Sequence, residues 1–185
     1  CSTQLNNTIQ QGLTGSTAVT ANSPISPSQT SAYQPGGTAI VLNPDISARI
    51  LTRHSDWLGR WSGVTLKGRQ NSILTVLQAY QVPHHSTAGP ATAFAQQRSL
   101  LSQQGRLESP REAFVCDLNK FLRALRASYP QGGLILMGDR NDDILRPSSK
   151  LGKVLDSHGL FDIHRYNNYP DDPPETYVRG SRQVD

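Results

Sequence analysis

The distribution of apolar positions divides the chain into a polar first part and a patterned remainder. Residues 1–32 consist mainly of Ser, Thr, Gln, Asn and Gly, and the first charged side chain is Asp45. A stretch with so few apolar side chains can bury little surface, so we predict a loop or a disordered lead-in over residues 1–32. The ordered domain is expected over residues 33–185, and a length of 185 residues fits one domain.

Short apolar runs bounded by turn residues predict strands in the first half of this domain. Residues 38–42 follow the turn at Pro35-Gly36-Gly37, which predicts a short buried strand. Residues 61–66 and 72–80 flank a polar loop over residues 67–71, and this arrangement predicts a β-hairpin.

Three segments carry apolar residues at helical spacing. The first covers residues 91–104. The second starts at Ser109-Pro110-Arg111-Glu112, a capping box with Pro at the first helical position, and ends near Pro130. The third covers residues 149–158. Because strands and helices alternate beside the hairpin, the pattern predicts an α/β fold, a mixed sheet with helices on its faces.

Residues 132–143 combine a short apolar run with a polar end. The run lies between glycines and predicts a strand buried on both faces, which brings Asp139 and Asn141 to the rim of the sheet. These residues are two apart, so both side chains can point the same way if the strand geometry persists. Asp and Asn also favour turns, and an ordinary turn explains the local pattern equally well.

The charge of the chain adds a class of partner. The net charge is +4, and 14 of the 18 basic residues are Arg. Guanidinium groups suit bidentate phosphate contacts, which indicates a nucleic acid or a phosphorylated partner. A solvated Arg-rich surface explains the composition alone equally well.

Cysteine usage and hydropathy bear on location. The two cysteines, Cys1 and Cys116, are too few for a disulfide framework and suit a reducing, intracellular compartment. Apolar runs are all shorter than a membrane span, so we expect no membrane partner.

The predicted strand ends collect a phenol, two carboxylates and an amide, which belong to Tyr80, Asp139, Asp185 and Asn141. Hard cations such as Mg²⁺ take carboxylate oxygens and bind substrate phosphates through their remaining positions. This set favours metal-assisted phosphoester chemistry over acyl transfer. The sequence contains no Gly-x-Ser-x-Gly elbow, P-loop or His-Glu-x-x-His motif that would indicate another chemistry.

Gly138-Asp139-Arg140-Asn141 is similar to the G-D-x-N signature of the endonuclease/exonuclease/phosphatase superfamily, to which apurinic endonucleases and DNase I belong. Six further segments resemble motifs of the family in the same order. They are Gly36–Ile40, Gly59-Arg60, Ala79–His84, Asp162–Arg165, Thr176-Tyr177 and Arg182–Asp185. The resemblance covers residues 33–185, is closest to the retrotransposon-associated branch, and implies a DNase I-like, four-layered α/β sandwich with two mixed central sheets.

The resemblance also implies roles for single residues. Asp139 would orient or deprotonate the attacking water and contribute weakly to a Mg²⁺ or Mn²⁺ site. Asn141 and Tyr80 would hydrogen-bond the scissile phosphate, and Asp185 would act near the site through a hydrogen-bond network. The residues implied to contact phosphates of the nucleic acid are Arg60 and Arg165. Arg140 departs from the family pattern, and we expect it to add a phosphate contact beside Asp139.

Other parts of the family pattern have no match in this chain. The family's metal-binding Glu lies before the matched segments and its closing Ser-Asp-His lies after them, so we expect a domain truncated at both ends and inactive, or nearly so, as given. His84, His85 and His164 do not occur in the context of the missing His. Arg140 occupies a position that is commonly apolar or aromatic in the family.

The function that the resemblance implies is a metal-dependent endonuclease of a retroelement that acts on DNA in the nucleus, with a reverse transcriptase region in the same parent polypeptide. RNA or a phosphorylated small molecule is an alternative substrate. A phosphatase of the same fold, acting on inositol phosphates or phospholipid head groups, fits the same motifs. So does a catalytically dead module that binds nucleic acid or protein, or a decayed copy of a retroelement.

Overall fold

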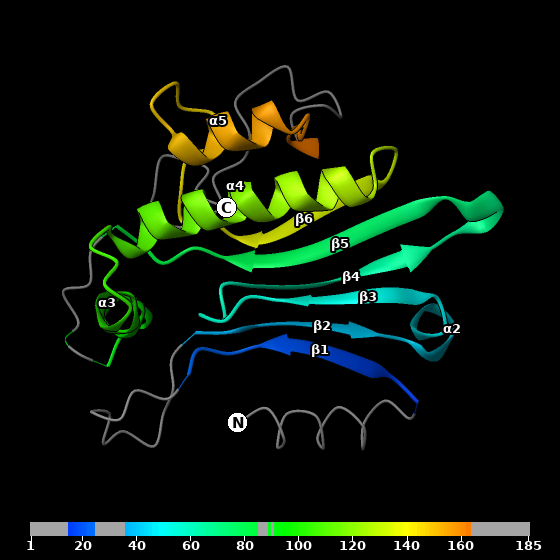
Figure 1. The fold of residues 1–185 in the computed structure, drawn as a ribbon, viewed down its shortest axis with the longest axis horizontal. Helices are drawn as coiled ribbons and strands as arrows, with labels where there is room; N and C mark the ends of the chain where they lie inside the picture. The colour runs from blue at the N-terminus through cyan, green and yellow to red at the C-terminus, as the bar shows by residue number, and fades with distance from the viewer. Residues whose placement is uncertain (1–14, 25–35, 85–88, 90, 164–185) are drawn as a thin grey trace.

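The computed structural model describes residues 15–24, 36–84, 89 and 91–163. They form an α/β protein with two sheets, and helices pack on the larger one (Figure 1). The smaller sheet pairs β1 (Thr17–Ala21) with β2 (Thr38–Leu42) in antiparallel orientation. The larger, mixed sheet has the order β3 (Ile50–Ser55), β4 (Trp61–Lys67), β5 (Ile73–Tyr80), β6 (Gly133–Asp139).

The helices begin at side chains that satisfy their first backbone N–H groups. α3 (Ala93–Gln103) is capped by Thr92, and α5 (Lys150–Ser157) is capped by Ser149. α4 (Pro110–Ser128) has the complete capping box with Pro at its first turn. Two short segments complete the set, α2 (Pro44–Ser47) and the 3₁₀ turn η1 (Arg69–Asn71). Within the described ranges, no helix is both long enough and apolar enough to cross a bilayer.

Two apolar clusters lie on the two faces of the larger sheet. Between the sheet and α4, Trp61 and Leu77 pack against Phe114, and the Trp61 and Phe114 rings meet edge to face at 5.9 Å. Between the two sheets, Val19 packs against Val64 of β4. The described residues therefore form three layers, with the larger sheet in the middle (Figure 1).

Most predicted elements are confirmed. The strand over residues 38–42 and the three helices are present, and β4 and β5 form the predicted antiparallel hairpin. Its loop, residues 68–72, is shifted by one position. Cys116 is exposed on α4, away from the apolar stripe of that helix.

The prediction of a loop or a disordered lead-in over residues 1–32 is wrong for Thr17–Ala21, which forms β1. This strand contributes only small side chains, but Val19 and Ala21 are buried against the larger sheet. Backbone pairing with β2 orders it despite its polar neighbours. β3 and α2 were also not predicted, since their apolar residues follow no clear period.

The prediction that the strand within residues 132–143 is buried on both faces is wrong as well. Among the described strands, β6 lies at the edge of the sheet: Leu134 and Leu136 pack towards α4, but Ile135 and Met137 are 47% and 42% exposed on the opposite face. In the described part of the chain, the smaller sheet packs over β4 and leaves β6 open on that side. In the described residues the smaller sheet is antiparallel, not mixed. The predicted pair of mixed sheets is therefore not seen there.

Candidate functional site

The carboxyl ends of β5 and β6 meet at one rim of the larger sheet. The two strands are parallel, and Tyr80 is the direct register partner of Asp139. Leu77 and Leu136 face α4, so the alternation of side chains places Tyr80 and Asp139 together on the opposite face. The prediction that these two residues meet at strand ends is confirmed, although 59 positions separate them in the sequence.

Asn141 joins this pair without strand geometry, the condition under which its side chain would have pointed the same way as that of Asp139. Strand geometry ends at Asp139, and Asn141 adopts the left-handed region with φ of 44°. Its N–H donates to Asp139 Oδ1 at 3.1 Å, and its Nδ2 donates to the carbonyl oxygen of Gln81 at 2.9 Å. The amide of Asn141 is thereby fixed beside the end of β5.

Gly138 permits the close approach of β6 to β5. Its φ is 132°, a region that residues with a side chain rarely adopt. A Cβ at this position would collide with the backbone of Ala79, including its carbonyl oxygen. The glycine in the motif thus has a structural cause, because it brings Asp139 into register with Tyr80.

We expect Gly138→Ala to lower the free energy of unfolding by about 1–3 kcal/mol, since the strands must separate to fit the methyl group. Urea denaturation measures this change. Gly105→Ala is the matched control, because Gly105 also has a positive φ of 71° but has open space around it. Equal losses in the two variants would show that the contact with Ala79 is unimportant.

Arg111 connects the segments that follow β5 and β6. This buried side chain donates from Nη1 to the carbonyl oxygens of Val82, at 2.7 Å, and Asn141, at 3.0 Å. Burial lowers the pKa of Arg111, and the charge of Asp142, 3.5 Å from Nη2, opposes that shift. The sequence indicated Arg111 only as part of a helix start, since nothing local shows which carbonyls it reaches.

The prediction that Arg60 contacts a phosphate is contradicted. Its side chain is 1% exposed, and it forms ion pairs with Asp56 at 2.7 Å and Asp117 at 2.8 Å. Burial would raise the pKa of Asp117, but hydrogen bonds from Arg106 and Arg60 outweigh it and hold that pKa below its usual value. Arg60 therefore joins the β3–β4 turn to α4. Its carbonyl oxygen accepts a bond from the Tyr80 N–H at 2.7 Å.

The remaining predicted residues have different outcomes. Arg140 follows β6 and is partly buried, and its Nε has no hydrogen-bond partner among the described residues. Its contact with a phosphate stays a prediction. Asp185 and Arg165, like His85 and His164, lie outside the described residues.

The described residues do not by themselves fit a bound divalent ion. Asp139 contributes one exposed carboxylate at the rim. In the part of the chain that the structure describes, no three His, Cys, Asp or Glu side chains gather closely enough to hold a metal. Asp139 could thus supply one oxygen ligand to a hard cation, with water or substrate phosphate as further ligands.

No family model matches the sequence. The curated proteins and the solved structures likewise give no significant match. The chemistry of this chain is therefore argued from a carboxylate, a phenol and an amide that meet at the ends of two parallel strands.

Proposed function

We propose that this chain belongs to a divalent-metal-dependent phosphodiesterase that cleaves nucleic acid, with DNA as the substrate. The observation that supports this best is the register pairing of Tyr80 with Asp139, with Asn141 bonded beside them. Acid–base and phosphate-binding groups on neighbouring strand ends are arranged for one reacting centre. The G-D-x-N resemblance assigns the same residues to phosphoester hydrolysis.

Each of these groups has a task in the hydrolysis of a phosphodiester. The exposed Asp139 carboxylate orients the attacking water and accepts its proton. The Tyr80 hydroxyl and the Asn141 amide donate to phosphate oxygens, whose charge grows during the reaction. An amide nitrogen carries two N–H groups, so Asn141 can keep its bond to Gln81 and still donate to the substrate.

The metal requirement and the biological setting rest on the resemblance alone. Mg²⁺ or Mn²⁺ would stabilise negative charge on the phosphate. The described carboxylates alone do not make a complete site for this ion. A four-layered sandwich, an origin in a retroelement, action in the nucleus and a linked reverse transcriptase are proposed on the same ground.

The test compares two substrates with the full native protein. We expect nicking of supercoiled plasmid DNA in Mg²⁺ and loss of nicking in EDTA. Release of inorganic phosphate from inositol polyphosphates, without nicking, would replace this proposal with a phosphatase. Salt-dependent DNA binding without cleavage of either substrate would show a binding module instead, because contacts with phosphates weaken steeply as salt rises.

A further inference from the structure

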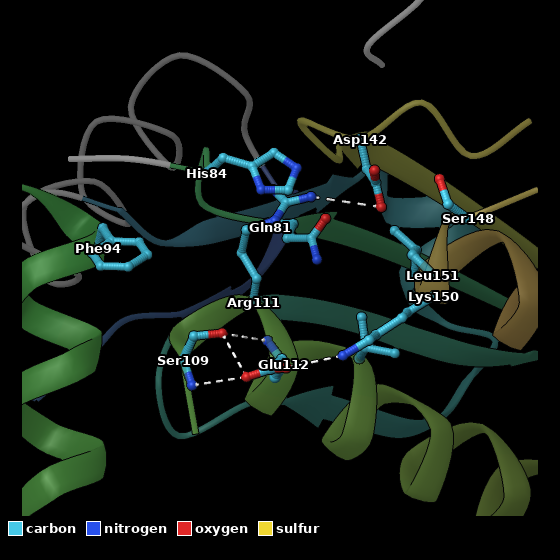
Figure 2. Close-up of a pocket in the computed structure, with 11 residues that line it drawn as sticks. Gln81, His84, Phe94, Ser109, Arg111, Glu112, Asp142, Ser148, Lys150 and Leu151 are labelled. Atoms are coloured by element: carbon cyan, nitrogen blue, oxygen red, sulfur yellow. Dashed lines mark hydrogen bonds and ion pairs between the residues drawn. The ribbon is translucent and has the colours of Figure 1, made fainter. Parts of the chain in front are cut away.

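A pocket of about 370 Å³ opens at the same rim, on the side of the sheet that α4 covers (Figure 2). It lies between the segment after β5, the first turn of α4 and the start of α5. Its volume falls within the range of small-molecule sites, roughly 300–1,000 Å³. The pocket is therefore large enough for part of a nucleotide.

Gln81 contributes an unsatisfied acceptor to this pocket. The residue is 1% exposed, and its Oε1 has no hydrogen-bond partner among the described residues. Figure 2 shows the Gln81 amide in the middle of the lining side chains, near Arg111 and Asp142. Buried acceptors normally have a hydrogen-bond partner, so an N–H or O–H donor of a ligand would satisfy Gln81 Oε1.

The charged side chains of the pocket are balanced. Arg111 lies 3.5 Å from Asp142, and Lys150 forms an ion pair with Glu112 at 2.9 Å. Because each cation has a carboxylate beside it, the pocket suits a neutral group better than a phosphate. The same carboxylates are further acceptors, which favours a ligand rich in N–H donors.

Apolar side chains form the rest of the wall. Phe94 lies at one side of the pocket, and Leu151 lines it from α5 (Figure 2). Val115 lines it from α4. An aromatic ring offers a face for stacking, and nucleobases have matching flat faces. A flat, neutral ligand with donor groups on its edge fits these three properties together.

We propose that this pocket binds a nucleobase that carries an exocyclic amino group on its major-groove edge, adenine or cytosine, whose N–H groups donate to Gln81 Oε1. Gln side chains pair with the amino edge of adenine, and carboxylates accept from the amino group of cytosine. Asp142 directly follows Asn141, so the base would belong to a nucleotide close to the cleaved phosphate. This last step rests on the proposed function, whereas binding of the base does not.

The test measures binding of matched mononucleotides to the protein by NMR titration, without metal. In two pairs, a carbonyl oxygen replaces the amino group and the neighbouring ring nitrogen gains an N–H: dAMP against dIMP, and dCMP against dUMP. We expect the amino member to bind at least about fivefold more tightly in one pair, and the pair that shows it identifies the base. Gln81→Met should abolish this preference. Gln96→Met is the matched control, because Gln96 is also buried, also has an unpartnered Oε1 and does not line the pocket.

Equal affinity within both pairs, or a preference that survives Gln81→Met, would overturn the proposal. If Gln81→Met does not fold, the comparison of nucleotides with the unaltered protein still decides between these outcomes. Phe94→Ala adds a second test, since it should weaken both members of a pair. Because no cleavage is measured, failure here leaves the phosphodiesterase proposal standing, and a lack of cleavage leaves the binding result standing.

Discussion

Replacement of Asp139 by Asn is expected to slow DNA cleavage by the full native protein about 10²- to 10⁴-fold. Asn has nearly the same shape and keeps an oxygen that can accept the bond from the Asn141 N–H. The fold and the position of Asn141 should therefore be preserved. What is lost is a carboxylate that can take the proton of the attacking water.

Initial rates of plasmid nicking measure this effect, and circular dichroism checks that the variant is folded. Asp156→Asn is the matched control, because Asp156 is an exposed carboxylate on α5, away from the rim. We expect no change in rate for that variant. Asp139→Asn with an unaltered rate would remove Asp139 from the mechanism, and with it the main support for the proposed function.

Asp56→Ala is expected to lower the free energy of unfolding by about 3–5 kcal/mol, because it strips most partners from a buried charge. Both oxygens of Asp56 accept bonds from the Arg60 guanidinium, at 2.7 and 2.9 Å. Oδ2 also accepts from the backbone N–H groups of Leu58 and Arg60. After the substitution, Asp117 alone would face the Arg60 cation.

Urea denaturation of Asp56→Ala and Arg146→Ala compares the loss of a buried ion pair with the loss of an exposed one. Arg146→Ala breaks the ion pair with Asp143, in which the Arg146 side chain is 48% exposed, and should cost at most about 1 kcal/mol. A similar decrease in the free energy of unfolding for Asp56→Ala and Arg146→Ala would mean that burial of Arg60 does not make the loss of its partner more destabilising. DNA binding should be unchanged wherever Asp56→Ala stays folded, because Arg60 does not reach the surface.

The elements that sequence patterns predicted correctly are those whose cause is local. The start of α4 follows from Ser109, Pro110 and Glu112, which lie within four positions of each other. The β4–β5 hairpin follows from two apolar runs and the polar loop between them. The ends of β5 and β6, where Tyr80 and Asp139 lie, are predictable because each follows a local apolar run.

The features that the sequence did not predict depend on distant partners. The residues next to Arg60 in the sequence do not show whether its side chain is buried or exposed. Only the fold brings Asp117, 57 positions later, to the Arg60 guanidinium. The exposure of Ile135 depends on which side of β6 is covered, which an apolar run does not show. The sequence left a turn at Asn141 open, but only the fold brings its amide to the carbonyl oxygen of Gln81, 60 positions earlier.

The bonds from Arg111 have a consequence for motion. One guanidinium nitrogen donates both to Val82, two residues after Tyr80, and to Asn141, two residues after Asp139. Neither segment can move away without breaking its own bond to this shared nitrogen. The two segments should therefore fluctuate as one cooperative unit, and the distance between the phenol and the carboxylate stays nearly constant while the surrounding surface moves.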